Sequence, residues 1–216
     1  MTPLIRPLGD SALLVRFGET LDPAANQAAI GFAARLDGKL PSGVLEIAPG
    51  LVSVLVRFDP VATEGEQLAG ELRLMLAEEA SASVQPAREH VISVSFGGDD
   101  GPDLERVATT LNTTPDRFIM AHNATPLRVL AIGFAPGFAY CGFHPDIMRL
   151  PRRKEVRPRV PAGTILFAAG QTAITATDVP TGWHVIGRTD LSNFEPDFDP
   201  PVMLRPGDRV RFEATE

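Results

Sequence analysis

The stretch Leu127–Phe143, LRVLAIGFAPGFAYCGF, divides the sequence into two parts of different character. It opens with the apolar run Leu127–Phe134, which predicts a buried strand, and continues with glycines alternating with aromatic residues. Of the 19 Gly and 20 Pro residues, 18 lie in the 84 residues from 133 onward and 21 in the 132 before them, so their density is higher in the second part. Because both residues interrupt regular structure, we expect short strands joined by turns in this second part.

Apolar runs alternate with turn residues through the rest of the second part. This spacing is typical of a small closed or sandwich-like β unit. Ahead of these runs, helical patterns cover residues 103–111 and the segment from Thr114 to His122, where Thr114 followed by Pro115 is a helix-start signal. The strands that we expect are 164–168, 171–176, 184–188, 202–204 and 209–212.

Upstream of the dividing stretch, strand and helix patterns alternate. Helices start at Asp22 and at Thr63, the latter with Glu66 three residues on as in a capping box. The resulting order, β-α-β-β-α-β, is the ferredoxin-like split pattern. We therefore predict an α+β protein with a ferredoxin-like α/β domain over 1–97 and a β-rich domain with leading helices over 98–216. The strands of the first domain are expected at 11–17, 44–48, 52–58 and 91–96.

The composition argues against several classes of protein. The chain has 20 basic and 27 acidic residues, and its net charge of −7 disfavours binding to nucleic acid or to anionic membranes. Cys141 is the only cysteine, so no disulfide forms within the chain and a reducing compartment is expected. No apolar run is long enough to span a bilayer and the N-terminus lacks a signal-peptide pattern, so we expect a cytoplasmic protein.

Three segments carry residues that suit ligand binding. Gly133–Phe143 combines glycines with aromatic side chains, which either wall a planar ligand or connect two domains tightly. Arg149–Arg159 holds six cationic residues and one acid, which form either a solvated surface or a site that captures a carboxylate or phosphate. The third segment, 160–189, has glycine-flanked polar residues such as Gln171 and Arg188, which are either ligand contacts or parts of β-turns.

The histidines show no metal-ligand spacing. His90, His122, His144 and His184 form no H-x-x-x-H or H-x-H pair, and Cys141 has no cysteine partner, so we predict no metal site. His122 lies at a predicted helix end, where it serves either as a general acid or base or as a helix-capping group. The sequence contains neither a G-x-x-x-x-G-K-[ST] phosphate loop nor a G-x-S-x-G nucleophile elbow.

Several ordered motifs resemble one known family over nearly the whole chain. They are similar to the family of the 5-oxoprolinase B subunit, which is also known as allophanate hydrolase subunit 1 and as KipI-like histidine-kinase inhibitors. The chain departs from the usual family motifs at 140–143, YCGF in place of YLGG, and at 169–174, AGQTAI in place of GGQTGI. The motifs that carry the resemblance are PLGDSALLVRFG, HVISVSFGGDDGPDLERVA, GFAPGFAYCGF, RVPAGTILFAAGQTAI, GWHVIGRT and LRPGDRVRF.

The resemblance implies a small α/β domain followed by a cyclophilin-like β-barrel domain. Family members work with a larger partner, called the C subunit or allophanate hydrolase subunit 2, and some also with a LamB-type A subunit. Such subunits together open 5-oxoproline to glutamate with ATP. We therefore expect an amidohydrolase-type subunit that works only with partners and shares ATP with them. The alternatives are the carboxyltransferase half of a biotin-dependent, urea amidolyase-type enzyme and an inhibitor of a histidine kinase.

The resemblance also suggests roles for individual side chains. Gln171 and Thr172 would contact the amide, and Arg159 or Arg188 would bind an anionic group. His122 would transfer the proton. His122, Gln171 and Arg188 are thus the expected catalytic residues. The expected substrate-binding positions are Gly133, Phe134, Pro136, Gly137, Phe138, Arg159, Pro161, Gly163, Thr172 and Trp183.

Overall fold

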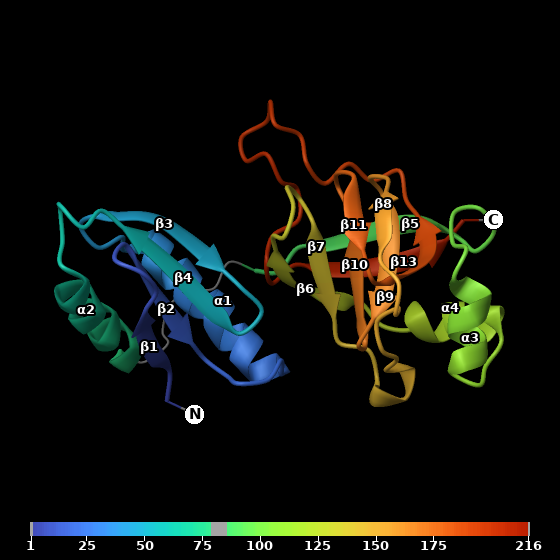
Figure 1. Ribbon diagram of the computed structural model, residues 1–216, viewed down its shortest axis with the longest axis horizontal. Helices are drawn as coiled ribbons and strands as arrows, with labels where there is room; N and C mark the ends of the chain where they lie inside the picture. The colour runs from blue at the N-terminus through green and yellow to red at the C-terminus, as the bar shows by residue number, and fades with distance from the viewer. Residues whose placement is uncertain (1, 79–85, 216) are drawn as a thin grey trace. The chain divides into compact units, whose positions relative to one another are not determined.

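The computed structural model of the chain describes residues 2–78 and 86–215. The chain divides into two compact units, Met1–Pro86 and Ala87–Glu216. Each unit has its own sheet, whose strands are labelled in Figure 1, and its own hydrophobic core. Among the described residues, no helix is long and apolar enough to cross a membrane.

The first unit is an antiparallel sheet with two helices. Its strands hydrogen-bond in the order β1-β2-β4-β3. The helices and the sheet enclose one core, to which the apolar positions of the helices contribute their buried faces. The elements are β1 Leu4–Pro7, β2 Ala12–Arg16, α1 Pro23–Gly38, β3 Val44–Pro49, β4 Ser53–Phe58 and α2 Gly65–Ala77.

The two helix starts predicted in this unit have different outcomes. The start of α1 is confirmed, because the Asp22 carboxylate accepts hydrogen bonds from the N–H groups of Ala24 and Ala25 at 2.9 and 3.0 Å. The capping box at Thr63 is wrong, since α2 begins one residue later, with Glu64 at its N-cap and no side-chain cap. The Thr63 side chain is buried, and its methyl group packs over the space beside Gly43.

The second unit is a closed β-barrel, with a two-stranded sheet and two helices outside the closed ring (Figure 1). The strands of the barrel follow the order β10-β7-β6-β13-β5-β12-β9, and β11 pairs with β8. The elements are β5 Glu89–Phe96, α3 Leu104–Thr110, α4 Pro115–His122, β6 Leu127–Ile132, β7 Ala139–Gly142, the 3₁₀ turn η1 Asp146–Met148, β8 Arg157–Val160, β9 Thr164–Ala168, β10 Gln171–Ile174, β11 Val179–Thr181, β12 His184–Arg188 and β13 Arg209–Ala214.

β5 belongs to the barrel, and this corrects the predicted boundary at residue 97. β5 runs parallel to β13 over six paired residues and antiparallel to the end of β12. Its Ile92 and Val94 side chains are buried in the barrel core. The fourth strand of the first sheet is instead β1, which pairs with β2 and precedes both helices. The first unit is therefore ββαββα rather than βαββαβ, and it ends near Pro86.

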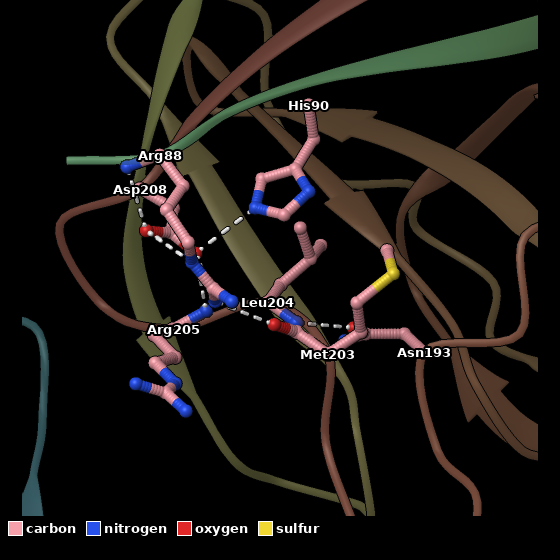
Figure 2. A network of polar contacts seen from close by, with 7 residues as sticks. All are labelled: Arg88, His90, Asn193, Met203, Leu204, Arg205 and Asp208. Atoms are coloured by element: carbon pink, nitrogen blue, oxygen red, sulfur yellow. Dashed lines mark hydrogen bonds and ion pairs between the residues drawn. The ribbon is translucent and has the colours of Figure 1, made fainter.

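The side chain of Asp208 stabilises the start of the parallel pair of β5 and β13. Its carboxylate accepts hydrogen bonds from the main-chain N–H of Arg88 at 3.1 Å and of Arg205 at 3.0 Å. The Arg88 guanidinium reaches the same carboxylate and the carbonyl of Met203, both at 2.8 Å, and His90 Nε2 lies 3.1 Å away (Figure 2). Burial alone would raise the pKa of Asp208, but these donors outweigh it and lower the pKa.

The strand expected at 202–204 is not formed. Val202 makes only an isolated bridge to Phe194. The N–H of Leu204 donates to the side-chain oxygen of Asn193 at 2.9 Å instead of joining a ladder (Figure 2). Asn193 also donates to the carbonyl of Gly137 at 2.7 Å, so this buried amide ties the segment to the glycine-rich loop.

Gly163 provides a test of the close contact between two loops of the barrel. Its φ is +79°, and a Cβ there would lie 2.2 Å from the carbonyl oxygen of Thr189. We expect Gly163→Ala to lower the free energy of unfolding by about 3 kcal/mol through strain and overlap. Gly98→Ala is the matched control, because Gly98 has a φ of +54° but open space around it, and it should cost about 1 kcal/mol. Equal losses in urea unfolding would contradict the contact.

Candidate functional site: an aromatic face on the barrel

Side chains of β7 and β10 alternate between the interior of the barrel and its outer face. Cys141 pairs with Thr172, and both are fully buried on the inner side. Tyr140 pairs with Ala173 and packs with the cluster outside the barrel. Gln171 shares the outer side with Ala173, because residues two apart on a strand face the same way.

Aromatic side chains form a continuous row on this outer face. The ring centroids of Phe134 and Phe138 lie 5.4 Å apart, those of Phe138 and Tyr140 4.8 Å, and those of Tyr140 and Trp183 6.0 Å. The Arg152 guanidinium lies 5.6 Å from the Trp183 ring centroid. We call this row, Arg152 and Gln171 the aromatic face. It places one cation beside aromatic rings, of which Phe138 and Trp183 are buried in a cluster and Phe134 is exposed.

Two polar side chains on the aromatic face have no partner within the described residues. Gln171 is 9% exposed as a residue, and its side-chain amide makes no hydrogen bond there. The Tyr140 hydroxyl likewise makes none. Burial raises the pKa of Tyr140, with Arg152 acting weakly in the other direction, so the hydroxyl stays a neutral donor. The amide and the hydroxyl each have donors and acceptors that a ligand could use.

Directly behind this face, two histidines share one hydroxyl. His122 Nε2 and His144 Nε2 each lie 2.8 Å from Thr172 Oγ1, and His122 Nδ1 lies 2.7 Å from Asn123 Oδ1. Burial lowers the pKa of His122 to about 4. Burial, together with the neighbouring His122, lowers the pKa of His144 to about 3. Both imidazoles are therefore neutral near pH 7.

The contacts of neutral imidazoles define the direction of this hydrogen-bonded chain. His122 Nδ1 donates to the Asn123 oxygen, so His122 Nε2 is an acceptor and takes the Thr172 hydroxyl proton. The Thr172 oxygen then accepts from His144 Nε2–H. His144 Nδ1 is left as an acceptor without a partner among the described residues.

The two histidines differ in their free ring atoms. His122 is 1% exposed, and both of its ring nitrogens have partners, Asn123 and Thr172. His144 has the free ring nitrogen, and its main-chain N–H donates to the carbonyl of Gly170, beside Gln171. Nothing in the local sequence around His144 signals this position, because His144, Thr172 on β10 and His122 on α4 meet only in the folded barrel.

Gln171 and Arg188, both expected to be catalytic, lie at opposite ends of β9. Gln171 pairs with Ala168, whereas Arg188 pairs with Thr164. Four residues of extended strand separate these partners by about 13 Å. The structure therefore groups Gln171, Thr172 and Trp183 near one end of the barrel and leaves Arg188 apart from them.

The arginine-rich segment binds carboxylates of the chain itself. Arg153 and Arg157 contact Asp103 at 2.5 and 2.7 Å, and Asp103 also accepts from the N–H of Val185 at 2.8 Å. Burial would raise the pKa of Asp103, but the Val185 hydrogen bond and the two guanidinium groups lower it. Arg159 pairs with Asp178 at the exposed surface. Among the described cations of this segment, Arg152 is the one that contacts the aromatic row.

The remaining predicted positions support loops. The chain from Gly133 to Phe138 closes a tight loop through a hydrogen bond of 3.0 Å between its ends, with Pro136 inside it. Phe134, with a φ of +78°, is exposed, while Phe138 is buried. The carbonyl of Pro161 accepts two threonine hydroxyls, so it and Gly163 have structural contacts. No group of three His, Cys, Asp or Glu residues that could hold a metal occurs among the residues described.

Comparison with known proteins places the chain in a family. The family model of the carboxyltransferase domain, subdomains C and D, matches residues 3–204. The chain belongs to this carboxyltransferase domain family. It is 34% identical to the B subunit of 5-oxoprolinase from Bacillus subtilis over 96% of the chain and 91% of that protein. It is also 34% identical to the corresponding B subunit from Escherichia coli O157:H7, over 95% of the chain and 93% of that protein.

Solved structures of similar proteins show the same fold. The crystal structure of TTHA0988 superimposes with a TM-score of 0.82 at 32% identity, and the match covers 99% of the chain but 40% of TTHA0988. The urea amidolyase of Kluyveromyces lactis matches with a TM-score of 0.78 over 99% of the chain and 15% of that protein. At 17% identity, the latter shows a shared fold alone.

The two neutral histidines predict how stability depends on pH. In the unfolded chain both titrate near 6.5, but in the fold their pKa values are about 4 and about 3. Between those values the unfolded chain binds protons that the fold does not, so stability is full above pH 6.5 and falls as the pH drops towards 4. His144→Gln should flatten this slope by up to about 1.4 kcal/mol per pH unit in urea unfolding.

The other two buried histidines set the background for that measurement. Burial lowers the pKa of His122 and of His184, so part of the slope remains in the variant. An unchanged slope in His144→Gln would contradict a neutral, buried His144.

Asp103 predicts a large effect on stability. Asp103→Asn leaves the guanidinium groups of Arg153 and Arg157 partly buried without a counter-charge. We expect a loss of about 3 kcal/mol in the free energy of unfolding. Asp178→Asn is the matched control, because its pair with Arg159 is exposed, and it should cost less than about 1 kcal/mol. Similar losses in thermal or urea unfolding would contradict the role of Asp103.

Proposed function

We propose that this chain is the B subunit of an ATP-dependent 5-oxoprolinase, which opens 5-oxoproline to glutamate and acts only with partner subunits. The observation that carries the proposal is the 34% identity to the B subunit of the Bacillus subtilis 5-oxoprolinase over 96% of the chain. The expected partners are a C subunit, of the allophanate hydrolase subunit 2 type, and a LamB-type A subunit.

The aromatic face is our proposed contact with 5-oxoproline. This substrate is a small flat lactam with one carboxylate. Tyr140, backed by the buried Trp183, would contact the ring, and the Arg152 guanidinium would pair with the carboxylate. The Gln171 amide, without another partner among the described residues, has both the donor and the acceptor that a lactam requires. Arg152 thus takes the anion-binding role expected of Arg159 or Arg188.

His144 is our proposed acid or base at this site. Ring opening needs a proton at the lactam nitrogen and its removal from the attacking water. His144 Nδ1 can accept a proton, and the chain through Thr172 to His122 keeps that tautomer in place. In this role His122 is a positioning residue behind the strand, and Thr172 links the two rings.

ATP is proposed to bind mainly on the partner subunits. A triphosphate needs several cations or a glycine-rich loop of N–H donors. On the aromatic face, among the residues that the structure describes, Arg152 is the cation that contacts the row, and one guanidinium does not fit a triphosphate. The ATP would supply phosphoryl activation of the lactam oxygen, which makes its carbon a better electrophile.

A second candidate function is the carboxyltransferase half of a biotin-dependent enzyme. It is favoured by the match to the carboxyltransferase domain over residues 3–204. The aromatic face would then receive a ureido ring rather than a lactam ring, since both present one amide edge. Inhibition of a histidine kinase is the remaining alternative, and the 34% identity to 5-oxoprolinase B subunits favours the enzyme subunit instead.

The assay is glutamate release from 5-oxoproline and ATP by the chain co-purified with its A and C subunits. We expect Gln171→Ala to lower kcat/KM about 100-fold, because it removes paired contacts to the amide. Arg152→Ala should raise KM about tenfold through loss of the carboxylate contact. Gln27→Ala, on the exposed surface of α1, is the matched control and should leave kcat/KM unchanged.

Two outcomes would contradict these proposals. A complete complex that releases no glutamate, yet transfers carboxylate from carboxybiotin, would favour the second candidate function. Full activity of both Gln171→Ala and Arg152→Ala would remove the aromatic face from the site while leaving the proposed subunit identity intact.

A further inference from the structure

One edge of β5 is open along half of its length. The main-chain groups of the even-numbered residues of β5 point toward β13 and hydrogen-bond to it. Thr215 N–H donates to the carbonyl of Val94, and Arg209 N–H donates to the carbonyl of Arg88 just before β5. The N–H and C=O of one strand residue point to the same side, so Val91, Ser93 and the other odd-numbered residues face the opposite side. That side belongs to β12.

β12 covers only the last part of that edge. Arg188 pairs with Ser95 and Gly187 with Phe96, and these are the two pairs between β12 and β5. The next residue, Thr189, donates its N–H to the carbonyl of Gly163 at 2.8 Å, on the side of β12 that faces β9. The main-chain groups of Val91 and Ser93 on this side consequently have no partner within the described residues. Unpaired strand edges of this kind are templates for the addition of another strand.

A groove of about 530 Å³ lies along the open edge. We call it the β5 groove. Its floor includes the outward side chains of Val91, Ser93 and Ser95, and Val91 is 58% exposed. Three further segments form its other walls. They are the turn between β5 and α3, the end of β12 with the residues just after it, and residue 215 after β13. They include Asp100, Arg188, Thr189, Asp190, Leu191 and Thr215.

The charged side chains of the β5 groove are unpaired. Asp100, Asp190 and Arg188 make no ion pair or hydrogen bond among the described residues. Two carboxylates and one guanidinium give the walls a net negative charge. A bound segment that carries a Lys or Arg would therefore be favoured, whereas a second copy of this acidic chain would bring like charges together.

We infer that the β5 groove receives an extended, basic segment of a partner subunit, which pairs as a strand beside Val91 and Ser93. The free main-chain groups recur every two residues, about 6.7 Å, which is the repeat of another extended chain rather than of a compact ligand. The inference rests on the proposed function in one respect, because it takes the partner to be a subunit of the same enzyme. Arg188 is then a contact to this segment.

Hydrogen exchange resolved by residue tests the inference on the full chain. In the free protein, the amides of Val91 and Ser93 should exchange rapidly, while those of Ile92 and Val94 are protected by β13. In the complex co-purified with the A and C subunits, the amides of Val91 and Ser93 should slow by about 100-fold or more.

Matched variants test the contacts one at a time. Ser93→Pro removes the N–H that faces the groove without removing a donor to β13, and it should weaken assembly about tenfold or more, whereas Ser93→Ala should assemble normally. Should Ser93→Pro fail to fold, Asp190→Lys keeps the test open, since it changes only an exposed charge. It should weaken assembly, and Asp116→Lys on the exposed surface of α4 should not.

The outcomes separate this inference from the proposed function. A complex that releases glutamate but leaves the exchange of Val91 and Ser93 unchanged would overturn strand addition and leave the proposed function standing. A chain that forms no complex with the A and C subunits would overturn both. Protection of both amides, together with weaker assembly of Asp190→Lys, would support the inference.

Discussion

The parallel pairing of β5 with β13 is the constraint on which the rest of the barrel depends. It joins residues about 120 positions apart in sequence and closes the ring between β6 and β12. Asp208 stabilises the start of the β5–β13 pair, because Arg88 and His90 both contact its buried carboxylate (Figure 2). A closed barrel has an inside and an outside, and each strand therefore supplies both.

The candidate site follows from that alternation. On β10, Thr172 turns inward to the two histidines while its neighbour Gln171 turns outward to the aromatic row. The hydrogen-bonded chain of Thr172 and the two neutral histidines and the unpaired Gln171 amide thus lie on opposite sides of β10. The main-chain N–H of His144 donates to the carbonyl of Gly170, the residue before Gln171, so the backbone of His144 lies close to the β9–β10 turn.

Local signals in the sequence predicted many elements well. Asp22 marked the start of α1, and the strands at 164–168 and 184–188 were placed with correct bounds. The partner of β5 was not predictable in the same way, because its alternating pattern suits either sheet and its true neighbour lies far along the chain. Likewise Gln171 and Trp183 could be named as polar and aromatic positions, but the meeting of His122 with His144 arises only from tertiary pairing.

Unfolding of two fragments tests the central claim, that β5 closes the barrel, most directly. Residues 87–216 retain β5 and its pairing with β13, whereas residues 98–216 lack it. We predict that the longer fragment unfolds cooperatively in urea with dispersed amide resonances, and that the shorter fragment shows neither property. Cooperative unfolding of the 98–216 fragment with equal stability would contradict the account.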